Sequence, residues 1–462
     1  MKFTQRFSIP KKMDLDKFVS GIWNPSLDEW RFVIEDYLHI SRKRIENKLS
    51  LFKLQLNILQ DIVSNYQGID NYKNEKVILE NKKEERIISD VDFQKEEKML
   101  ESEISALEII NRSVKEIADG IAWRFFNYNR AILYTLANKQ PISPIKYDKG
   151  LLKTVLEYSE MFLMPDKLAI LNDITNFLRV GDITTIDTAD GTIEFVEVKS
   201  SRQRGHRITR QKERMEELVE FFNTGISEFD GNKLKIVDSA IKQKNYLNIL
   251  KDGINRAKAK GIHSEAIGNY LIIEIINFET IFQKKIEIEE ANQYFKSKHK
   301  TITNKWVEME DIVIPFDFID KLNFARNYAP YSIFPFNEEI CVDIIMGRTN
   351  IRSIVNFSEI VRIMDKYGWK TVDNLFLKIK ALEENDEKGT QELKEQSVEH
   401  WLTVEKEGFR VDLPPGILGR LHFELLSPMA IVDHLNELYE EGPRKENEMF
   451  LTNYINNQKI WD

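Results

Sequence analysis

The sequence has little of what secreted or membrane-bound proteins rely on. Cys341 is the only cysteine among 462 residues, so no disulfide can form within the chain, and a reducing compartment is expected. A lone cysteine of this kind is expected to be a small core residue. No apolar run approaches the roughly 18 residues of a membrane span. The basic segment Met1–Pro10 lacks the apolar centre of a secretory signal. We therefore expect a cytoplasmic protein without membrane contacts.

Common cofactor motifs are missing as well. The 7 histidines stand at no zinc-ligand spacing with one another or with the cysteine, which argues against a zinc site. There is no Gly-x-x-x-x-Gly-Lys-Ser/Thr phosphate loop, and no Gly-x-Gly-x-x-Gly after a predicted strand. Any ATPase or sensor activity would have to come from a separate partner protein.

What the chain does have is length and a globular composition. Its 462 residues suffice for two or three domains, and 42% hydrophobic with 11% aromatic residues is typical of a folded protein. The net charge is −9, so the average field of the molecule does not attract nucleic acid. A nucleic-acid interface would have to be a local basic surface.

Two long amphipathic patterns dominate the first part of the chain. Apolar residues recur at alternating steps of four and three from Ile45 to Tyr66, and a second helical pattern runs from Leu100 to Ile121. The polar stretch 67–90 lies between them. We expect an antiparallel helical hairpin, with residues 1–104 forming an N-terminal helical or coiled-coil region. Its seam is either intramolecular, which is favoured slightly, or the interface of a homo-oligomer.

A predicted β-hairpin carries the main candidate site. Gly181–Asp187 and Ile193–Ser201 read as strands, and Asp190-Gly191 between them is a strong turn signal. Folding this hairpin would bring Asp182 back towards Glu197 and Lys199, which share one face of their strand. Two carboxylates suit Mg²⁺ or Mn²⁺, and a nearby ammonium suits a phosphate.

The order of these residues resembles the PD-(D/E)XK nuclease superfamily, over roughly Glu116–Asn277. The resemblance implies that Asp182 and Glu197 bind the metal, that the carbonyl of Val198 can join them, and that Lys199 is catalytic. Gly181 stands where the family name has proline. The resemblance also implies an αβββαβ core, which residues 105–280 would form, and in which the apolar run Ile267–Asn277 reads as a buried strand.

Two further elements of the family pattern can be placed. A helix before the sheet often lends an acid to the site, and Glu116 is our candidate, with Asp119 and, at lower odds, Asp173 as alternatives that the sequence cannot separate. A glutamine on the helix after the lysine approaches the scissile phosphate in several branches, which points to Gln211. Around it lies a basic segment that we expect to contact a phosphate backbone, with its arginines at Arg202, Arg204, Arg207, Arg210 and Arg214.

The region 281–462 is expected to be an accessory domain, mixed but mainly helical. Its aromatic, turn-rich segment Pro330–Asn337 could stack on bases, but packing into a core is the favoured interpretation. The expected fold class is therefore α+β/α/β: an N-terminal antiparallel helical hairpin, a restriction-endonuclease-like αβββαβ core and this accessory domain.

The expected function is that of a Mg²⁺-dependent (or Mn²⁺-dependent) endonuclease acting on DNA, in a setting such as bacterial anti-phage or mobile-element defence. Two alternatives stay open. One is a nucleic-acid-binding or scaffold protein that keeps the nuclease fold without cutting. The other is a ribonuclease, because some members of the superfamily process RNA.

Overall fold

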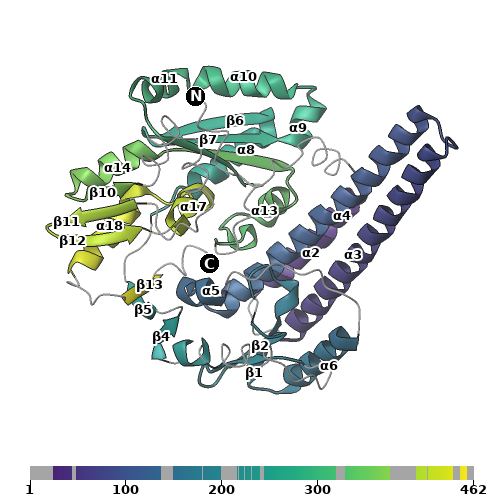
Figure 1. Ribbon diagram of the computed structural model, residues 1–462, viewed down its shortest axis with the longest axis horizontal. Coiled ribbons are helices and arrows are strands. Elements are labelled where there is room, and N and C mark those ends of the chain that lie inside the picture. The colour runs from purple at the N-terminus through teal and green to yellow at the C-terminus, as the bar shows by residue number, and fades with distance from the viewer. Residues whose placement is uncertain are drawn as a thin grey trace. The chain divides into compact units, whose positions relative to one another are not determined.

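The computed structural model describes residues 24–43, 48–136, 149–178, 180–198, 216, 218–222, 224–229, 232–239, 244–318, 328–374, 402–413, 415–440 and 448–454. The chain divides into two compact units of mixed helix and sheet (Figure 1). The hairpin unit comprises 14–240, 329–347 and 446–462, and the sheet unit comprises 241–328 and 348–445. The boundaries expected at 104/105 and 280/281 fall inside helices α4 (Asp90–Phe125) and α9 (Phe278–Gln283).

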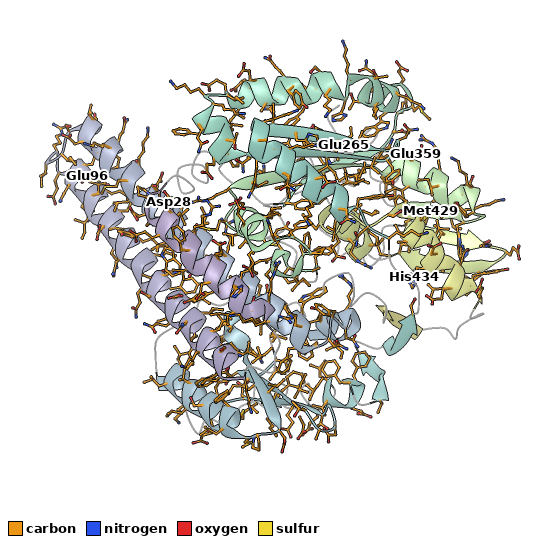
Figure 2. The ribbon with its side chains drawn as sticks, turned by 180° about the vertical axis from the view of Figure 1, so that it is seen from behind. Asp28, Glu96, Glu265, Glu359, Met429 and His434 are labelled. Atoms are coloured by element: carbon orange, nitrogen blue, oxygen red, sulfur yellow. The ribbon has the colours of Figure 1, made fainter. Side chains whose placement is uncertain are left out.

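The hairpin unit is built on three helices: α2 (Ser26–Arg42), α3 (Lys48–Glu84) and α4. The polar stretch 67–90 was expected to link two helices, but most of it is helical, because α3 continues to Glu84. Polar side chains do not end a helix when they face solvent or pair with a neighbour, and Lys76 pairs with Glu97 at 3.0 Å and Glu101 at 2.7 Å. The turn falls at 85–89, and Ser89 caps α4 by accepting from the Asp92 amide. Glu96 lies near this turn (Figure 2).

The seam between α3 and α4 is intramolecular in the described residues. Asn65 donates to Asn111 across it at 3.0 Å, and Leu79, Phe93 and Leu100 form a buried cluster near the turn. Gly68 allows the close approach, because a Cβ there would lie 2.8 Å from a side-chain carbon of Leu107. The prediction of an antiparallel helical hairpin is thus confirmed. The buried stripe of α3 is shifted from the expected one: Leu54, Ile58 and Ile62 are buried, whereas Leu49 is exposed.

A small antiparallel sheet follows in the same unit. Its strands β1 (Lys167–Leu171), β2 (Ile183–Asp187) and β3 (Ile193–Val196) lie in that order, with Ile183 opposite Val196. Helices α5 (Arg130–Leu136) and α6 (Lys149–Leu163) precede it. The predicted β2–β3 hairpin is confirmed, and Gly191 in its turn has φ +77°, which favours glycine.

A second sheet of the hairpin unit joins distant parts of the chain. Strands β4 (Ile226–Phe229) and β5 (Asn232–Ser239) are antiparallel, and β13 (Glu448–Tyr454) lies parallel to β5. Parallel strands need a long connection, and here nearly the whole sheet unit stands between the two strands in sequence.

The segment 329–347 belongs to the hairpin unit and packs into its core. It contains the 3₁₀ turn η3 (Tyr331–Ile333) and helix α13 (Glu338–Ile345), which Asn337 caps. Tyr331 and Phe334 are each 1% exposed and Phe336 is 4% exposed. The interpretation of these aromatic residues as core residues rather than a base-stacking surface is confirmed.

The sheet unit is organised around four antiparallel strands, in the order β6-β7-β9-β8. They are β6 (Ile262–Ile267), β7 (Leu271–Asn277), β9 (Thr349–Asn356) and β8 (Val313–Asp317). Helix α8 (Leu247–Lys260) packs on β6 and β7 and ends at Gly261, whose φ of +95° favours glycine. Helices α9, α10 (Ile288–Lys298) and α11 (Lys300–Glu308) follow β7 in the chain.

The apolar run 267–277 therefore does not complete an αβββαβ core. Its strand begins at Leu271, after a turn in which Gly268 has φ +56°, and it pairs with β6 and with the distant strand β9 rather than with β1–β3. Periodicity identified a buried strand correctly but could not identify its partners, because pairing depends on tertiary contacts. The restriction-endonuclease-like arrangement is thus not formed by these segments.

The last part of the sheet unit holds another antiparallel sheet, with strands β10 (Lys370–Asn374), β11 (Leu402–Lys406) and β12 (Phe409–Leu413). Helices α14 (Phe357–Lys366), α17 (Pro415–Phe423) and α18 (Pro428–Glu440) accompany it, and α18 carries Met429 and His434 (Figure 2). The described region after residue 280 is mixed and mainly helical, as expected, but its individual strands were not predicted. Five-residue strands are too short for a clear alternation signal.

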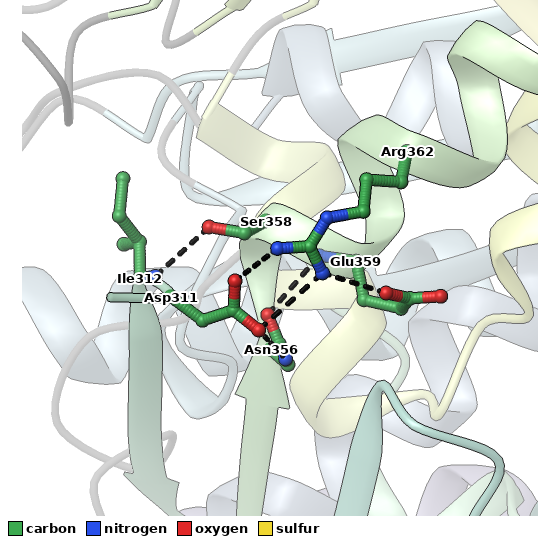
Figure 3. A network of polar contacts seen from close by, with 6 residues as sticks. All are labelled: Asp311, Ile312, Asn356, Ser358, Glu359 and Arg362. Atoms are coloured by element: carbon green, nitrogen blue, oxygen red, sulfur yellow. Dashed lines mark hydrogen bonds and ion pairs between the residues drawn. The ribbon is translucent and has the colours of Figure 1, made fainter. Parts of the chain in front are cut away.

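A buried polar network ties β8 to α14 within the sheet unit (Figure 3). The Asp311 side chain, 1% exposed, accepts hydrogen bonds from Asn356 at 2.8 Å and from Arg362. Asn356 also caps α14 by accepting from the Glu359 amide at 3.0 Å, and Ser358 accepts from the Ile312 amide at 2.9 Å. The buried carboxylate of Asp311 is thereby paired, as burial requires.

Candidate functional site

Asp182 lies directly before β2, where the backbone of three segments meets. Its amide donates to the Val196 carbonyl at 2.8 Å, and its carbonyl accepts from the Asn172 amide at 2.9 Å. Its carboxylate accepts a hydrogen bond of 2.5 Å from the Val198 amide. The β2–β3 hairpin thus brings Asp182 beside residues 196–198, as the turn signal at Asp190-Gly191 predicts.

Acidic groups gather around this carboxylate. The pKa of Asp182 is raised to about 7, mainly by burial and then by the negative charges of Glu197 and Asp173, while the hydrogen bond from Val198 acts in the opposite direction. Glu197 is exposed, directly after β3, and Asp173 lies in the 3₁₀ turn η2 (Asn172–Ile174) after β1. Such mutual repulsion means that a cation placed here would stabilise the ionised form of Asp182.

Asn172 positions the candidate acid. It is 1% exposed, and its amide group donates to the carbonyls of Val180 at 2.8 Å and Gly181 at 3.1 Å. Its side-chain oxygen accepts from the Thr184 hydroxyl at 2.8 Å. These bonds hold the backbone on both sides of Asp182. In sequence, the only signal for Asn172 is its position next to Asp173, one of the candidate acids.

The two acids considered on the preceding helix have different partners. Glu116, 5% exposed, accepts from the Tyr331 amide at 2.6 Å, so its carboxylate supports the segment 329–347. Asp119 accepts from both the amide and the side chain of Asn176, at 2.7 and 2.8 Å. Asn176 lies in the β1–β2 connection that also carries Asp173. Of the two, Asp119 is therefore the one that contacts the segment leading to Asp182.

The donor set suits a hard divalent cation. Asp182 and Glu197 offer carboxylate oxygens, the type of ligand that Mg²⁺ and Mn²⁺ prefer. Within the described ranges, no group of three or more His, Cys, Asp or Glu side chains is arranged to hold a metal ion. Any further ligands would have to be backbone carbonyls, such as that of Val198, or water.

Several predicted site residues lie outside the described residues. Lys199 follows directly after the last described position of this segment, and Gln211 and the basic segment lie beyond it. Their roles stay predictions, as do those of Arg202, Arg204, Arg207, Arg210 and Arg214.

Comparison with known proteins adds no identification. No family model matches the chain, and neither a curated protein nor a solved structure matches it. No described helix is long and apolar enough to cross a membrane.

Proposed function

We propose that this chain is a Mg²⁺- or Mn²⁺-dependent nuclease that hydrolyses phosphodiester bonds in DNA. One observation carries the proposal: the hairpin holds the half-buried carboxylate of Asp182 within reach of the negative charge of Glu197, which together with burial raises the pKa of Asp182 to about 7. Perturbed carboxyl groups held close together are characteristic of functional sites. Here the sequence order around them is that of the PD-(D/E)XK pattern.

The roles follow from the chemistry of the residues. Asp182 and Glu197 would hold the cation, while the Val198 amide and Asn172 keep Asp182 in place. When bound, Mg²⁺ supplies polarisation of a phosphate oxygen and a lower pKa for coordinated water. We assign to Lys199 the stabilisation of charge on the phosphate and to Gln211 an approach to the scissile group. The basic segment would bind the DNA backbone without reading its sequence.

The setting that fits this proposal is defence against phage or mobile elements, in which such a nuclease would work with a separate ATPase or sensor. A nucleic-acid-binding scaffold that does not cut is the second candidate, since the net charge of −9 leaves only local basic segments for binding. The two differ in one measurable respect, which is turnover of substrate in the presence of metal.

The first test is cleavage of plasmid, linear duplex, single-stranded DNA and RNA with Mg²⁺, Mn²⁺ or EDTA. We expect DNA cleavage with either metal and none in EDTA. Asp182→Asn and Glu197→Gln should each lower the rate more than about 100-fold, because even outer-shell partners of a metal cost 10–100-fold. Glu194→Gln is the matched control: it removes an exposed carboxylate of β3 that pairs with Lys167 instead.

A second measurement separates metal binding from catalysis. Mn²⁺ should raise the thermal unfolding temperature of the wild type and of Glu194→Gln but not that of Asp182→Asn, since a ligand stabilises only the state that binds it. Cleavage by Asp182→Asn at the wild-type rate would reject this site. Metal binding and DNA binding without cleavage would favour the scaffold, and cleavage of RNA alone would favour a ribonuclease.

A further inference from the structure

A pocket of about 380 Å³ opens within the hairpin unit beside the C-terminal part of α4, which contributes Gly120 and Arg124 to its lining. Its walls come from the end of α2, the last turns of α4 and the segment 332–336. Helices α2 and α4 pack against each other in this unit (Figure 1). The volume falls within the range of about 300–1,000 Å³ found for small-molecule sites.

Two arginines line this pocket. The Arg42 guanidinium donates to three carbonyls of the opposite wall, those of Ser332, Phe334 and Phe336, at 3.0, 2.9 and 2.7 Å. It also lies 3.0 Å from the sulfur of Cys341. All four acceptors are formally neutral. Arg42 is therefore a fixed positive charge, held rigidly by backbone that is itself packed in the core.

Arg124 is held on one side only. Its Nη1 donates to the carbonyls of Ser41 and Lys43 at the C-terminal end of α2. Its Nε and Nη2 groups have no acceptor within the part of the chain that the structure describes. Those three N–H donors form one edge of the guanidinium fork, which matches the paired oxygens of a phosphate or carboxylate.

Charge in the pocket is not balanced by the protein. Among its described lining residues there is no aspartate or glutamate, and neither Arg42 nor Arg124 makes an ion pair with a described carboxylate. Other arginines of this chain do: Arg31 lies 3.3 Å from Asp343, Arg352 3.1 Å from Asp317, and Arg362 2.7 Å from Glu359. Helix capping accounts for Nη1 of Arg124, but it explains neither the remaining donors nor the open volume.

We propose that this pocket binds the phosphate group of a small phosphorylated molecule, of about the size of a nucleoside monophosphate. A phosphate monoester carries about −1.5 to −2 charges at neutral pH, which balances two guanidinium groups, whereas a carboxylate balances one. Arg124 would grip the phosphate with its open edge, and Arg42 would supply the second charge. The volume beyond one phosphate accommodates the rest of the ligand. This site is independent of the proposed nuclease centre.

The experiment is isothermal titration of the full chain with inorganic phosphate, AMP and adenosine. EDTA is present, so that no metal site contributes, and ionic strength is held constant. AMP and phosphate should bind, AMP more tightly, and adenosine should not. Arg124→Gln should weaken AMP binding about tenfold or more, because a charged hydrogen-bond pair contributes at least that factor. Arg124→Lys keeps the positive charge at the end of α2 but loses the guanidinium fork. The affinity of this variant for AMP should therefore lie between those of the wild type and Arg124→Gln.

Arg256→Gln is the matched control, since Arg256 is an exposed arginine of α8 in the other unit, 3.7 Å from Glu265. Its affinity for AMP should equal that of the wild type. Circular dichroism identifies any variant that fails to fold. If Arg124→Gln does not fold, Arg124→Lys is compared with the wild type instead. Lack of binding by the wild type, equal binding of adenosine, or undiminished affinity in Arg124→Lys would overturn the proposal. Binding of a 5′-phosphorylated dinucleotide but not of AMP would assign the pocket to a nucleic-acid end instead, which also overturns it.

Discussion

His422 is a fully buried imidazole that the proposed activity does not use. Its Nδ1 lies 2.8 Å from the Ser353 hydroxyl, and its Nε2 has no partner in the described residues. The ring packs 4.6 Å from that of Phe316. Burial lowers the pKa of His422 to about 3, so the side chain stays neutral in the folded protein at any pH near neutrality.

This histidine should make stability depend on pH. The unfolded chain takes up a proton near pH 6.5, whereas the folded chain does so only near pH 3, so stability is complete above 6.5 and falls between these values. From pH 7 to 5 the loss from this group is about 2 kcal/mol. Urea unfolding at both pH values should show a smaller loss in His422→Asn than in the wild type. Equal pH dependence of the two proteins would contradict a neutral buried histidine.

At the scale of elements, the Gln55 side chain forms hydrogen bonds with the backbone of the edge strand β1. In the described part of its sheet β1 is an edge strand, and Gln55 of α3, fully buried, binds that strand with both ends of its amide. It donates to the Ala169 carbonyl at 3.1 Å and accepts from the Leu171 amide at 3.0 Å. The helical hairpin is thereby fastened to the small sheet that carries Asp182, and two buried backbone groups are satisfied.

Removal of this amide should be costly. Gln55→Leu keeps the apolar contacts but leaves the Ala169 carbonyl and the Leu171 amide without partners, and each buried unsatisfied group costs about 1–3 kcal/mol. We expect the free energy of unfolding to fall by about 2–4 kcal/mol in urea titrations. Gln60→Leu, on an exposed position of the same helix, should change it by less than about 0.5 kcal/mol. Similar values for both variants would show that the clamp contributes nothing.

At the scale of the whole molecule, the hairpin unit is assembled from distant parts of the chain. Residues 329–347 stand far from 14–240 in sequence, yet they belong to the same unit. Ile340, Val342 and Ile344 of that segment are buried, and the Tyr331 amide satisfies the buried Glu116 carboxylate. A fragment that ends before the segment would expose an apolar surface and would lose the hydrogen bond from the Tyr331 amide to Glu116.

We therefore expect residues 14–240 alone to bind a hydrophobic dye and to unfold without a cooperative transition. The same fragment joined to 329–347 by a flexible glycine-serine linker should recover part of that cooperativity, because the linker restores a high local concentration of the segment. The intact chain serves as the reference. Cooperative unfolding of 14–240 by itself, monitored by circular dichroism and dye fluorescence, would show that the segment is dispensable for this unit.

Local signals in the sequence predicted individual elements well. The Asp190-Gly191 turn placed the β2–β3 hairpin, and with it the approach of Asp182 to residues 196–198. The period of the apolar residues identified α3 and α4. Each of these depends on neighbours within a few residues or on one helical face, and so can be recognised without knowledge of the rest of the fold.

The sequence did not predict which strands pair when they lie far apart in the chain. The strand within 267–277 lies beside β6 and β9 rather than in the sheet of Asp182, and short strands after residue 313 escaped notice. Asp119 contacts Asn176, but the sequence could not favour Asp119 over Glu116, because both acids lie on one helix. Which of them meets the sheet depends on how that helix packs.

By itself the sequence determined the helical hairpin, the β2–β3 turn and the order of acids that suggests a metal site. Only the tertiary structure decided which segments share a core, that Asn172 and the Val198 amide hold Asp182, and that Arg42 and Arg124 line one pocket. The reason is physical. Turns and helical faces are set by local dihedral preferences and the burial of one stripe, whereas strand partners and buried charges depend on groups brought together from distant parts of the chain.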